Sequence, residues 1–206
     1  PFFARSIVAL LDALELERAH VVGNSMGGRV ALELGLSDPE RVGKLILLAP
    51  SLAWLRPRPW AAALRLVPTQ LGLIQPAPRP LVEAIVRRVI PDGTRQWTAA
   101  GIDEFLRSYL KPTGRAAFYA AARNIYLEEP WGPSGFWTRL PSLRPEALFV
   151  WGRRDTLVPI AFSRHVRDAL PCARHLELDC GHVPQLERPH ETHDAIERFL
   201  SERADG

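Results

Sequence analysis

The sequence lacks the features that mark membrane, secreted and nucleic-acid-binding proteins. No apolar run reaches the roughly 20 residues that a membrane-spanning helix needs. The net charge of +3 comes from dispersed arginines, with no block of like charge and no basic-aromatic interleaving that would suggest a nucleic-acid groove. Only two cysteines occur, Cys172 and Cys180, without a secretory signal, so we expect reduced, buried thiols rather than a disulfide. These absences favour a cytoplasmic protein without a membrane span or a nucleic-acid partner.

The sequence also lacks a methionine at its first position. It begins at Pro1 without a charged-then-apolar leader, so we expect either a C-terminal fragment or the removal of residues preceding Pro1. The 206 residues, 47% apolar and 24% charged, can bury one substantial core of ordinary globular composition. One domain with an insertion accounts for this length.

One short stretch, residues 20–28 with the sequence HVVGNSMGG, contains a Gly-x-Ser-x-Gly motif. An apolar run precedes the motif and a helical pattern follows it, which predicts a strand, a tight turn and a helix. Such a turn lifts the hydroxyl of Ser25 clear of the sheet. We expect Gly23 and Gly27 to be required, because a Cβ at either position would clash with the crowded backbone. The stretch therefore predicts a nucleophile elbow; the alternative is a turn whose serine only caps the helix.

Apolar patterns on both sides of this stretch predict alternating helices and parallel strands. Leucine and isoleucine recur at helical spacing from Ile7 to Leu14. Nearly continuous apolar runs are typical of a parallel sheet that is covered on both faces. The expected strands are 20–23, 44–50, 147–152 and 175–179, and the expected later helices are 29–34, 159–170 and 190–203. We therefore expect an α/β fold with a mostly parallel sheet flanked by helices.

Residues 51–141 differ in composition from the rest of the chain. They hold most of the 19 prolines and five of the six tryptophans, and no segment among them reads convincingly as a strand. A proline-broken helical segment between two strands is typical of a lid. We therefore expect a helical cap at 51–141 inserted into a core formed by residues 1–50 and 142–206.

The pattern within this insertion predicts helices at 81–90, 102–110 and 116–127, with irregular connectors at 56–59 and 75–80. An alternative to the lid is a helical subdomain that only adds stability. Its tryptophans would then form a core, whereas in a lid some of them would face Ser25. These tryptophans are Trp54, Trp60, Trp97, Trp131 and Trp137.

Three polar residues of complementary chemistry follow predicted strands, in the order Ser25, Asp155 and His182. Because the carboxyl ends of parallel strands meet at one edge of a sheet, we expect these side chains to lie close together. A serine hydroxyl is a poor nucleophile at neutral pH, so His182 would accept its proton and later return it to the leaving group. Asp155 would hold the imidazole in the required tautomer. The order and the positions together predict a catalytic triad.

This order resembles that of the α/β-hydrolase family, in which serine, acid and histidine follow one another along the chain. The family's Gly-x-x-Asp is matched by residues 152–155, and its Gly-His by residues 181–182. The resemblance covers the whole chain, with residues 51–141 in the place of the family's cap, and implies a serine hydrolase without cofactor or metal. Family members carry several strands and a His-Gly loop before the elbow helix. We therefore expect N-terminal strands to be missing from this chain.

The resemblance also implies an oxyanion hole. One donor is expected to be the backbone N–H of Met26, which follows the nucleophile at a helix N-terminus. The second donor is expected from the loop ahead of Pro1.

The remaining candidate residues have weaker patterns. Asp179 and Asp194 are rival acids, but neither lies in the family's acid loop. A zinc site formed by the two cysteines and His182 lacks the required ligand spacing, so no metal is expected. The remaining histidines have no motif around them and are expected at the surface or in turns: His20, His165, His175, His190 and His193.

The residues around the nucleophile limit the possible classes of substrate. A serine at position 25 argues against the members that use an aspartate nucleophile. Residues 23–28 are similar to the elbow of hydrolases that cleave C–C bonds in ring-fission products of aromatic catabolism, and to that of ordinary esterases. Those C–C hydrolases often carry tryptophan after the catalytic histidine, where this chain has Val183. We therefore rank a small-molecule, apolar carboxylic ester first and a C–C substrate second. A non-catalytic ligand-binding module or an inactive fragment is the alternative of another class.

Overall fold

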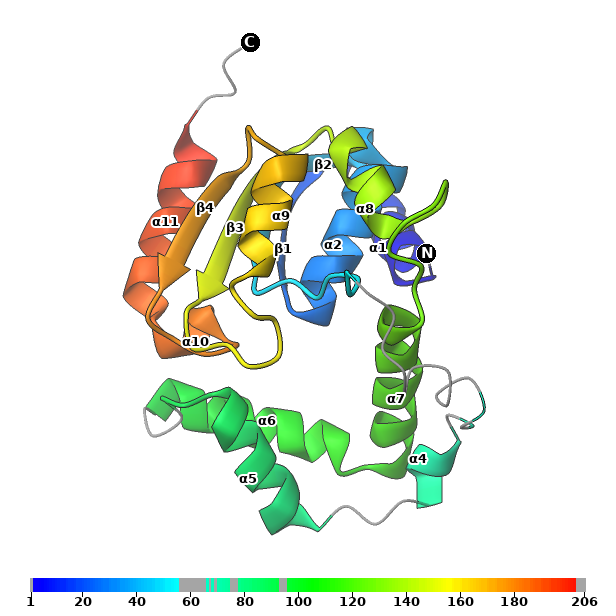
Figure 1. Ribbon diagram of the computed structural model, residues 1–206, viewed down its shortest axis with the longest axis vertical. Coiled ribbons are helices and arrows are strands. Elements are labelled where there is room, and N and C mark those ends of the chain that lie inside the picture. The colour runs from blue at the N-terminus through cyan, green and yellow to red at the C-terminus, as the bar shows by residue number, and fades with distance from the viewer. Residues whose placement is uncertain are drawn as a thin grey trace. The chain divides into compact units, whose positions relative to one another are not determined.

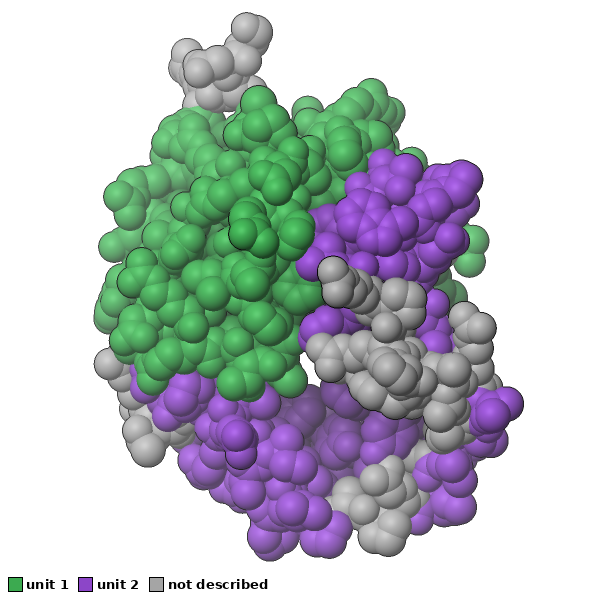
Figure 2. All heavy atoms as spheres, viewed as in Figure 1, with its two compact units in different colours: residues 1–51, 139–206 green, residues 52–138 purple. Residues whose placement is uncertain are grey.

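The computed structural model describes residues 2–55, 66, 68, 70–74, 78–92 and 96–202 (Figure 1). Contacts divide the chain into two compact units, coloured separately in Figure 2. The sheet unit comprises residues 1–51 and 139–206, and the helical unit comprises residues 52–138.

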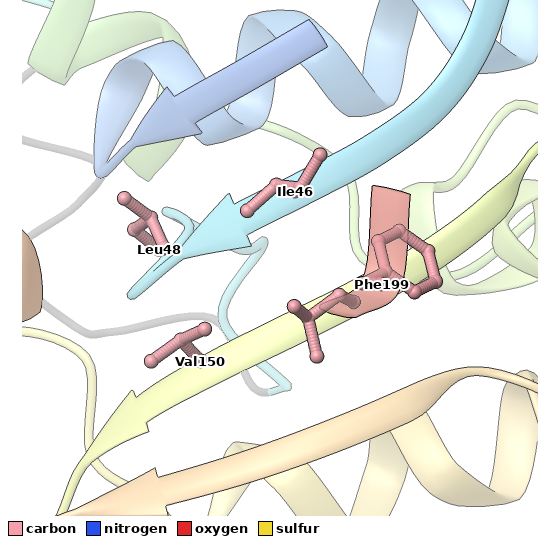
Figure 3. Packing of buried hydrophobic residues seen from close by; sticks show 5 residues of the cluster. Ile46, Leu48, Val150 and Phe199 are labelled. Carbon is pink, nitrogen blue, oxygen red and sulfur yellow. The ribbon is translucent and has the colours of Figure 1, made fainter. Parts of the chain in front are cut away.

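The sheet unit is built on four parallel strands in the order β1-β2-β3-β4. The parallel arrangement predicted from the apolar runs is confirmed. All four strands point the same way, so their carboxyl ends lie along one edge (Figure 3). Asn24 pairs with Leu48, and Gly152 pairs with Leu178, at the ends of neighbouring strands. The strands are β1 (Ala19–Asn24), β2 (Val42–Leu48), β3 (Glu146–Gly152) and β4 (Arg174–Leu178).

Helices connect and cover these strands. The elements expected in residues 1–50 and 142–206 are present, with ends within a few residues of the predicted ones. The helices of this unit are α1 (Phe2–Ala13), α2 (Met26–Ser37), α9 (Phe162–Ala169), α10 (Pro184–Glu187) and α11 (Pro189–Ser201), with 3-10 turns η1 (Pro39–Arg41) and η2 (Leu140–Ser142). The short helix α8 (Phe136–Arg139) crosses the boundary between the two units.

The core of the sheet unit lies on both faces of the central strands. Side chains alternate along a strand, so Ile46, Leu48 and Val150 share one face, where Phe199 of α11 packs against them (Figure 3). On the other face, Gly35 of α2 comes so close to Leu45 that a Cβ there would lie 2.9 Å from a leucine methyl group. Burial on both faces explains why β2 and β3 are almost entirely apolar.

The helical unit contains no strand among its described residues. Its helices are α4 (Leu71–Ile74), α5 (Arg79–Val89), α6 (Gln96–Tyr109) and α7 (Pro112–Tyr126). Prolines stand in the first turn of α5 and α7, where a missing N–H costs nothing. The connector expected at 56–59 lies outside the described residues, as do residues 75–77 of the second connector.

The tryptophans of the helical unit have different environments. Trp137 is buried, with 4% of its surface exposed, and its indole N–H donates to the carbonyl of Ala53 at 3.0 Å. Trp131 is 52% exposed and donates to the carbonyl of Leu55 at 3.1 Å. Trp60 lies outside the described residues, as does the side chain of Trp97.

The two cysteines are free thiols, but only one of them is buried. Cys180 lies in the interior, and burial raises the pKa of its thiol to about 12. The expectation of a buried thiol is wrong for Cys172, which is exposed in the turn between α9 and β4.

Candidate active site

Ser25 sits in the turn between β1 and α2 with φ 54° and ψ −117°. A positive φ is uncommon for a residue with a side chain, and such strain is concentrated at functional sites. The turn is held by its backbone, since the N–H of Ser25 donates to Leu48 and its carbonyl accepts from Arg29, at 3.0 and 3.1 Å. Although Ser25 precedes the helix, its side chain makes no capping hydrogen bond. The hydroxyl is therefore left for other partners.

Two glycines make this turn possible, but they are not the two that the motif suggests. A Cβ at Gly23 would lie 2.4 Å from the backbone of Gly27, which confirms the expectation for Gly23. A Cβ at Gly27 would meet nothing within 4 Å, so the expectation of a clash there is wrong. The crowded position is Gly28, where a Cβ would lie 2.8 Å from Pro50. The crowding around Ser25 thus arises from the loop after β2 as well as from the backbone of the elbow itself.

A chain of hydrogen bonds links the three residues that the sequence places after strands. The Oγ of Ser25 lies 2.8 Å from Nε2 of His182, and Nδ1 of the same ring lies 2.7 Å from Oδ2 of Asp155. His182 and Asp155 are both buried. The structure therefore brings together all three side chains, which come from positions up to 157 residues apart in sequence.

The carboxylate of Asp155 is oriented by the loop that carries it. Its Oδ1 accepts the backbone N–H groups of Leu157 and Val158 at 2.8 and 3.0 Å, which leaves Oδ2 for the imidazole. The loop is also tied to the segment before His182, because the N–H of Arg154 donates to the carbonyl of Cys180 at 2.9 Å. The hydrogen bonds to Oδ1 and the bond from Arg154 to Cys180 therefore both fix the Asp155 carboxylate relative to the imidazole of His182.

The backbone around His182 is held by two side chains that the sequence analysis did not single out. Glu187, fully buried, accepts the N–H groups of Gly181 and Val183 at 2.9 and 3.0 Å. The amide of Asn24 donates to the carbonyl of His182 at 3.1 Å. In the sequence the only signals are a lone carboxylate five residues after the histidine and a polar residue beside the serine.

Met26 follows Ser25 along the chain, and Ser51 lies beside it in space. Met26 is the first residue of α2, so its backbone N–H belongs to the first helical turn, where N–H groups lack partners within the helix. The Oγ of Ser51 lies 3.4 Å from that of Ser25, and its N–H donates to the Ser25 carbonyl at 2.9 Å. No motif indicates Ser51, whose closeness to Ser25 depends on the pairing of β2 with β1.

The rival residues lie away from this chain of hydrogen bonds. Asp179 is ion-paired with Arg154 at 2.9 Å on the surface, and Asp194 is exposed on α11. Among the described residues, no group of three or more His, Cys, Asp or Glu side chains is arranged to hold a metal ion. Nor does any helix in the described part of the chain have the length and apolar character to cross a membrane.

One histidine, His175, contradicts the expectation of a surface or turn position, whereas His20 is exposed, as expected. His20 lies in β1, where its Nδ1 accepts the backbone N–H of Lys44 at 2.9 Å, and His175 lies in β4. The Nδ1 of His175 accepts the indole N–H of Trp151 at 3.0 Å, and the two rings are nearly parallel. Burial, followed by the charge of Arg167, lowers the pKa of His175 to about 4. His165, His190 and His193 lie on helices, the last two exposed.

Comparison with known proteins identifies the family. The model of the alpha/beta hydrolase fold matches residues 1–189, and the chain belongs to this family. The α/β-hydrolase fold and enzyme class predicted from the motifs are thereby confirmed.

Among curated relatives, a 2-hydroxy-6-oxo-6-phenylhexa-2,4-dienoate hydrolase of Comamonas testosteroni is 30% identical, over 97% of this chain and 68% of its own length. A 2-hydroxy-6-oxononadienedioate/2-hydroxy-6-oxononatrienedioate hydrolase of Paraburkholderia xenovorans is 28% identical, over 96% of this chain and 67% of its own length. Two others are covered over 63% of their length. The chain thus spans about two thirds of these relatives.

A solved structure, the enol-lactonase of Burkholderia xenovorans LB400, has a TM-score of 0.75 at 21% identity, over 97% of this chain and 72% of its own. At this identity the likeness concerns the fold. A hydrolase of Pseudomonas aeruginosa is similar at 25% identity, with the same TM-score, over 97% of this chain and 71% of its own.

Proposed function

We propose that the protein hydrolyses carboxylic esters of small apolar substrates through a covalent acyl-enzyme on Ser25. The observation that supports this most directly is the chain of hydrogen bonds from Ser25 through His182 to Asp155, with distances of 2.8 and 2.7 Å. The strained backbone at Ser25 adds support, because it holds the hydroxyl in a conformation that a helix cap does not need.

The chemistry follows from these contacts. Ser25 Oγ attacks the ester carbonyl carbon while its proton passes to Nε2 of His182, giving a tetrahedral oxyanion and an imidazolium that Asp155 stabilises. The C–O bond then breaks, and His182 returns the proton to the departing alcohol. A water molecule attacks the acyl-enzyme in the same way, with His182 again taking the proton, and the acid is released as Ser25 is regenerated. The backbone N–H of Met26 would donate to the oxyanion.

A second candidate is hydrolysis of a C–C bond in a ring-fission product. Two observations favour it: the sequence GNSMGG at residues 23–28, and curated relatives named as 2-hydroxy-6-oxo-dienoate hydrolases. Val183 stands where such enzymes often carry tryptophan. We therefore rank ester hydrolysis above C–C bond hydrolysis. The same serine and histidine would serve either reaction.

The test uses a fluorophosphonate probe, which reacts covalently with activated serines. We expect mass spectrometry to find the probe on Ser25, and Ser25→Ala to lower nitrophenyl-ester turnover by about four orders of magnitude or more with the fold intact. The control is Ser37→Ala, an exposed serine at the end of the same helix. Undiminished turnover by Ser25→Ala would refute the proposal, and no labelling of a folded protein would favour the non-catalytic alternative.

The bond type is decided by a second measurement on the same protein. We expect a higher kcat/KM for a short-chain ester than for a 2-hydroxy-6-oxo-dienoate. The reverse ratio would establish the C–C reaction in its place.

A further inference from the structure

The main chain on both sides of His182 is bound to a single buried carboxylate. Glu187 Oε2 accepts the N–H of Gly181 at 2.9 Å, and its Oε1 accepts the N–H of Val183 at 3.0 Å. Its side chain is fully buried within the sheet unit. The two oxygens thus bind the residues immediately before and after the histidine.

A charge in this position is costly unless it is well bonded. Transfer of a carboxylate from water to a protein interior costs several kcal/mol, which strong hydrogen bonds to the charged form offset. The main chain of Glu187 also donates to the carbonyl of Val183 at 3.0 Å, so side chain and backbone both bind the same residue. These hydrogen bonds close the loop from Gly181 to Glu187 on itself and restrict its backbone conformation.

Two other side chains hold the same loop from outside, one half-buried and one buried. The amide of Asn24 donates both to Leu48 at 2.9 Å and to the carbonyl of His182 at 3.1 Å, which ties the histidine to the end of β2. The hydroxyl of Thr192, buried in α11, donates to the carbonyl of Pro184 at 3.1 Å. The ring of His182 is consequently held through its backbone rather than through packing alone.

We propose that Glu187 is a positioning residue for His182: it fixes the peptide groups on both sides of the histidine so that the ring reaches Asp155 and Ser25 at once. This inference rests on the proposed function of His182. The two ring contacts are 2.7 and 2.8 Å, and a displacement of about 1 Å at such a site costs about 100-fold in rate. Glu187 itself touches no reacting atom.

The primary test is Glu187→Gln, which keeps the shape of the side chain. Its amide oxygen can accept one of the two N–H groups, while its NH₂ group faces the other as a second donor. We expect kcat for nitrophenyl esters to fall about 10-fold with KM within about 2-fold, and Glu187→Ala to lower kcat about 100-fold where it folds. The control is Glu191→Gln, an exposed carboxylate in the first turn of α11.

A second measurement does not depend on activity. A proton on Nδ1 of His182, hydrogen-bonded to Asp155, is expected to give a downfield proton NMR signal that reports the position of the imidazole ring. We expect this signal to broaden or disappear in Glu187→Gln and to persist in Glu191→Gln, with both spectra taken at a temperature where each variant is fully folded. An unchanged signal and unchanged kcat in Glu187→Gln would overturn the inference, as would lower stability without a change in either. If Ser25 is not labelled by the probe, the proposed function fails, while the NMR signal still decides whether Glu187 positions the ring.

Discussion

The two units of this protein use their apolar and polar residues in different ways. In the sheet unit the central strands are buried on both faces, and the polar groups near Ser25 are bonded to the backbone. In the helical unit, α6 buries Ile102 and Leu106, whereas Leu81 and Ile85 of α5 are 59% and 58% exposed. The strands of the sheet unit therefore hold individual atoms in fixed places, whereas α5 of the helical unit leaves Leu81 and Ile85 at the surface.

The difference follows from how each kind of element is held. In the described sheet β2 and β3 are bonded to a neighbour on both sides and β1 and β4 on one side, so residues just beyond the strand ends begin from a fixed point. An amphipathic helix is held by one face only, and its stability depends on the few side chains that this face buries. We therefore expect substitutions around Ser25 to change chemistry at nearly constant stability, and substitutions in the helical unit to change stability first.

The largest expected effect is on the chemistry of the sheet unit. Asp155→Asn should lower kcat by about four orders of magnitude, because the new NH₂ group faces Nδ1 of His182 and forces the wrong tautomer. Oδ1 can still accept from Leu157 and Val158, so thermal unfolding should change little. The measurement is steady-state ester hydrolysis beside a melting curve. The control is Asp179→Asn, an exposed acid after the next strand, and equal activity in the two variants would contradict the role of Asp155.

The next effect is on the stability of the helical unit. Trp137→Ala should lower the free energy of unfolding by about 3 to 5 kcal/mol, because a buried indole is removed and a cavity is left. Trp131→Ala, at a half-exposed ring, should cost less than about 1.5 kcal/mol, even though its hydrogen bond to Leu55 is lost. Both are measured by denaturant unfolding. Equal costs would show that burial does not govern stability in this unit.

The sequence predicted the parts of the molecule that depend on local pattern. Apolar runs gave the parallel strands because both faces of the sheet are buried, and the Gly-x-Ser-x-Gly motif gave the elbow. The position of Ser25, Asp155 and His182 at one edge followed from the rule that parallel strands end together.

The parts it did not predict depend on contacts between distant segments. The crowding at Gly28 comes from Pro50, which lies beyond a whole helix and strand. The environment of His175 comes from Trp151 on a neighbouring strand. Glu187 binds only locally, but its orientation depends on how the loop folds back, and no periodicity reveals that.

A smaller effect distinguishes crowded from open positions within the elbow. Gly23→Ala should cost about 1 to 3 kcal/mol or more, because its Cβ would lie 2.4 Å from the backbone of Gly27. Gly27→Ala meets open space in a helix, where alanine is favoured over glycine, so its stability should be unchanged or higher by up to about 1 kcal/mol. Thermal melts of the two variants test this pair, and a larger loss at Gly27 would show that the turn is packed differently.

The smallest expected effect is a pH dependence of stability in the sheet unit. His175 has an ordinary pKa of 6.5 when unfolded and about 4 when folded, so its ring is neutral in the native protein at both pH 7 and pH 5. Between about pH 6.5 and pH 4 the unfolded chain binds more protons than the native chain, and stability falls as the pH falls through this window. Protonation at Nδ1 would also displace the hydrogen bond from Trp151. Acidification should therefore lower the melting temperature.

His175→Phe keeps an aromatic ring beside Phe149 and Trp151 but removes the titrating group. We expect a lower melting temperature than wild type at pH 7, because the indole N–H loses its acceptor, and a smaller drop between pH 7 and pH 5. The control is His190→Phe at an exposed position on α11, which should keep the wild-type pH dependence. If His175→Phe loses as much stability on acidification as wild type, the acid sensitivity belongs to other groups, and the aromatic stack on β3 and β4 has no part in it.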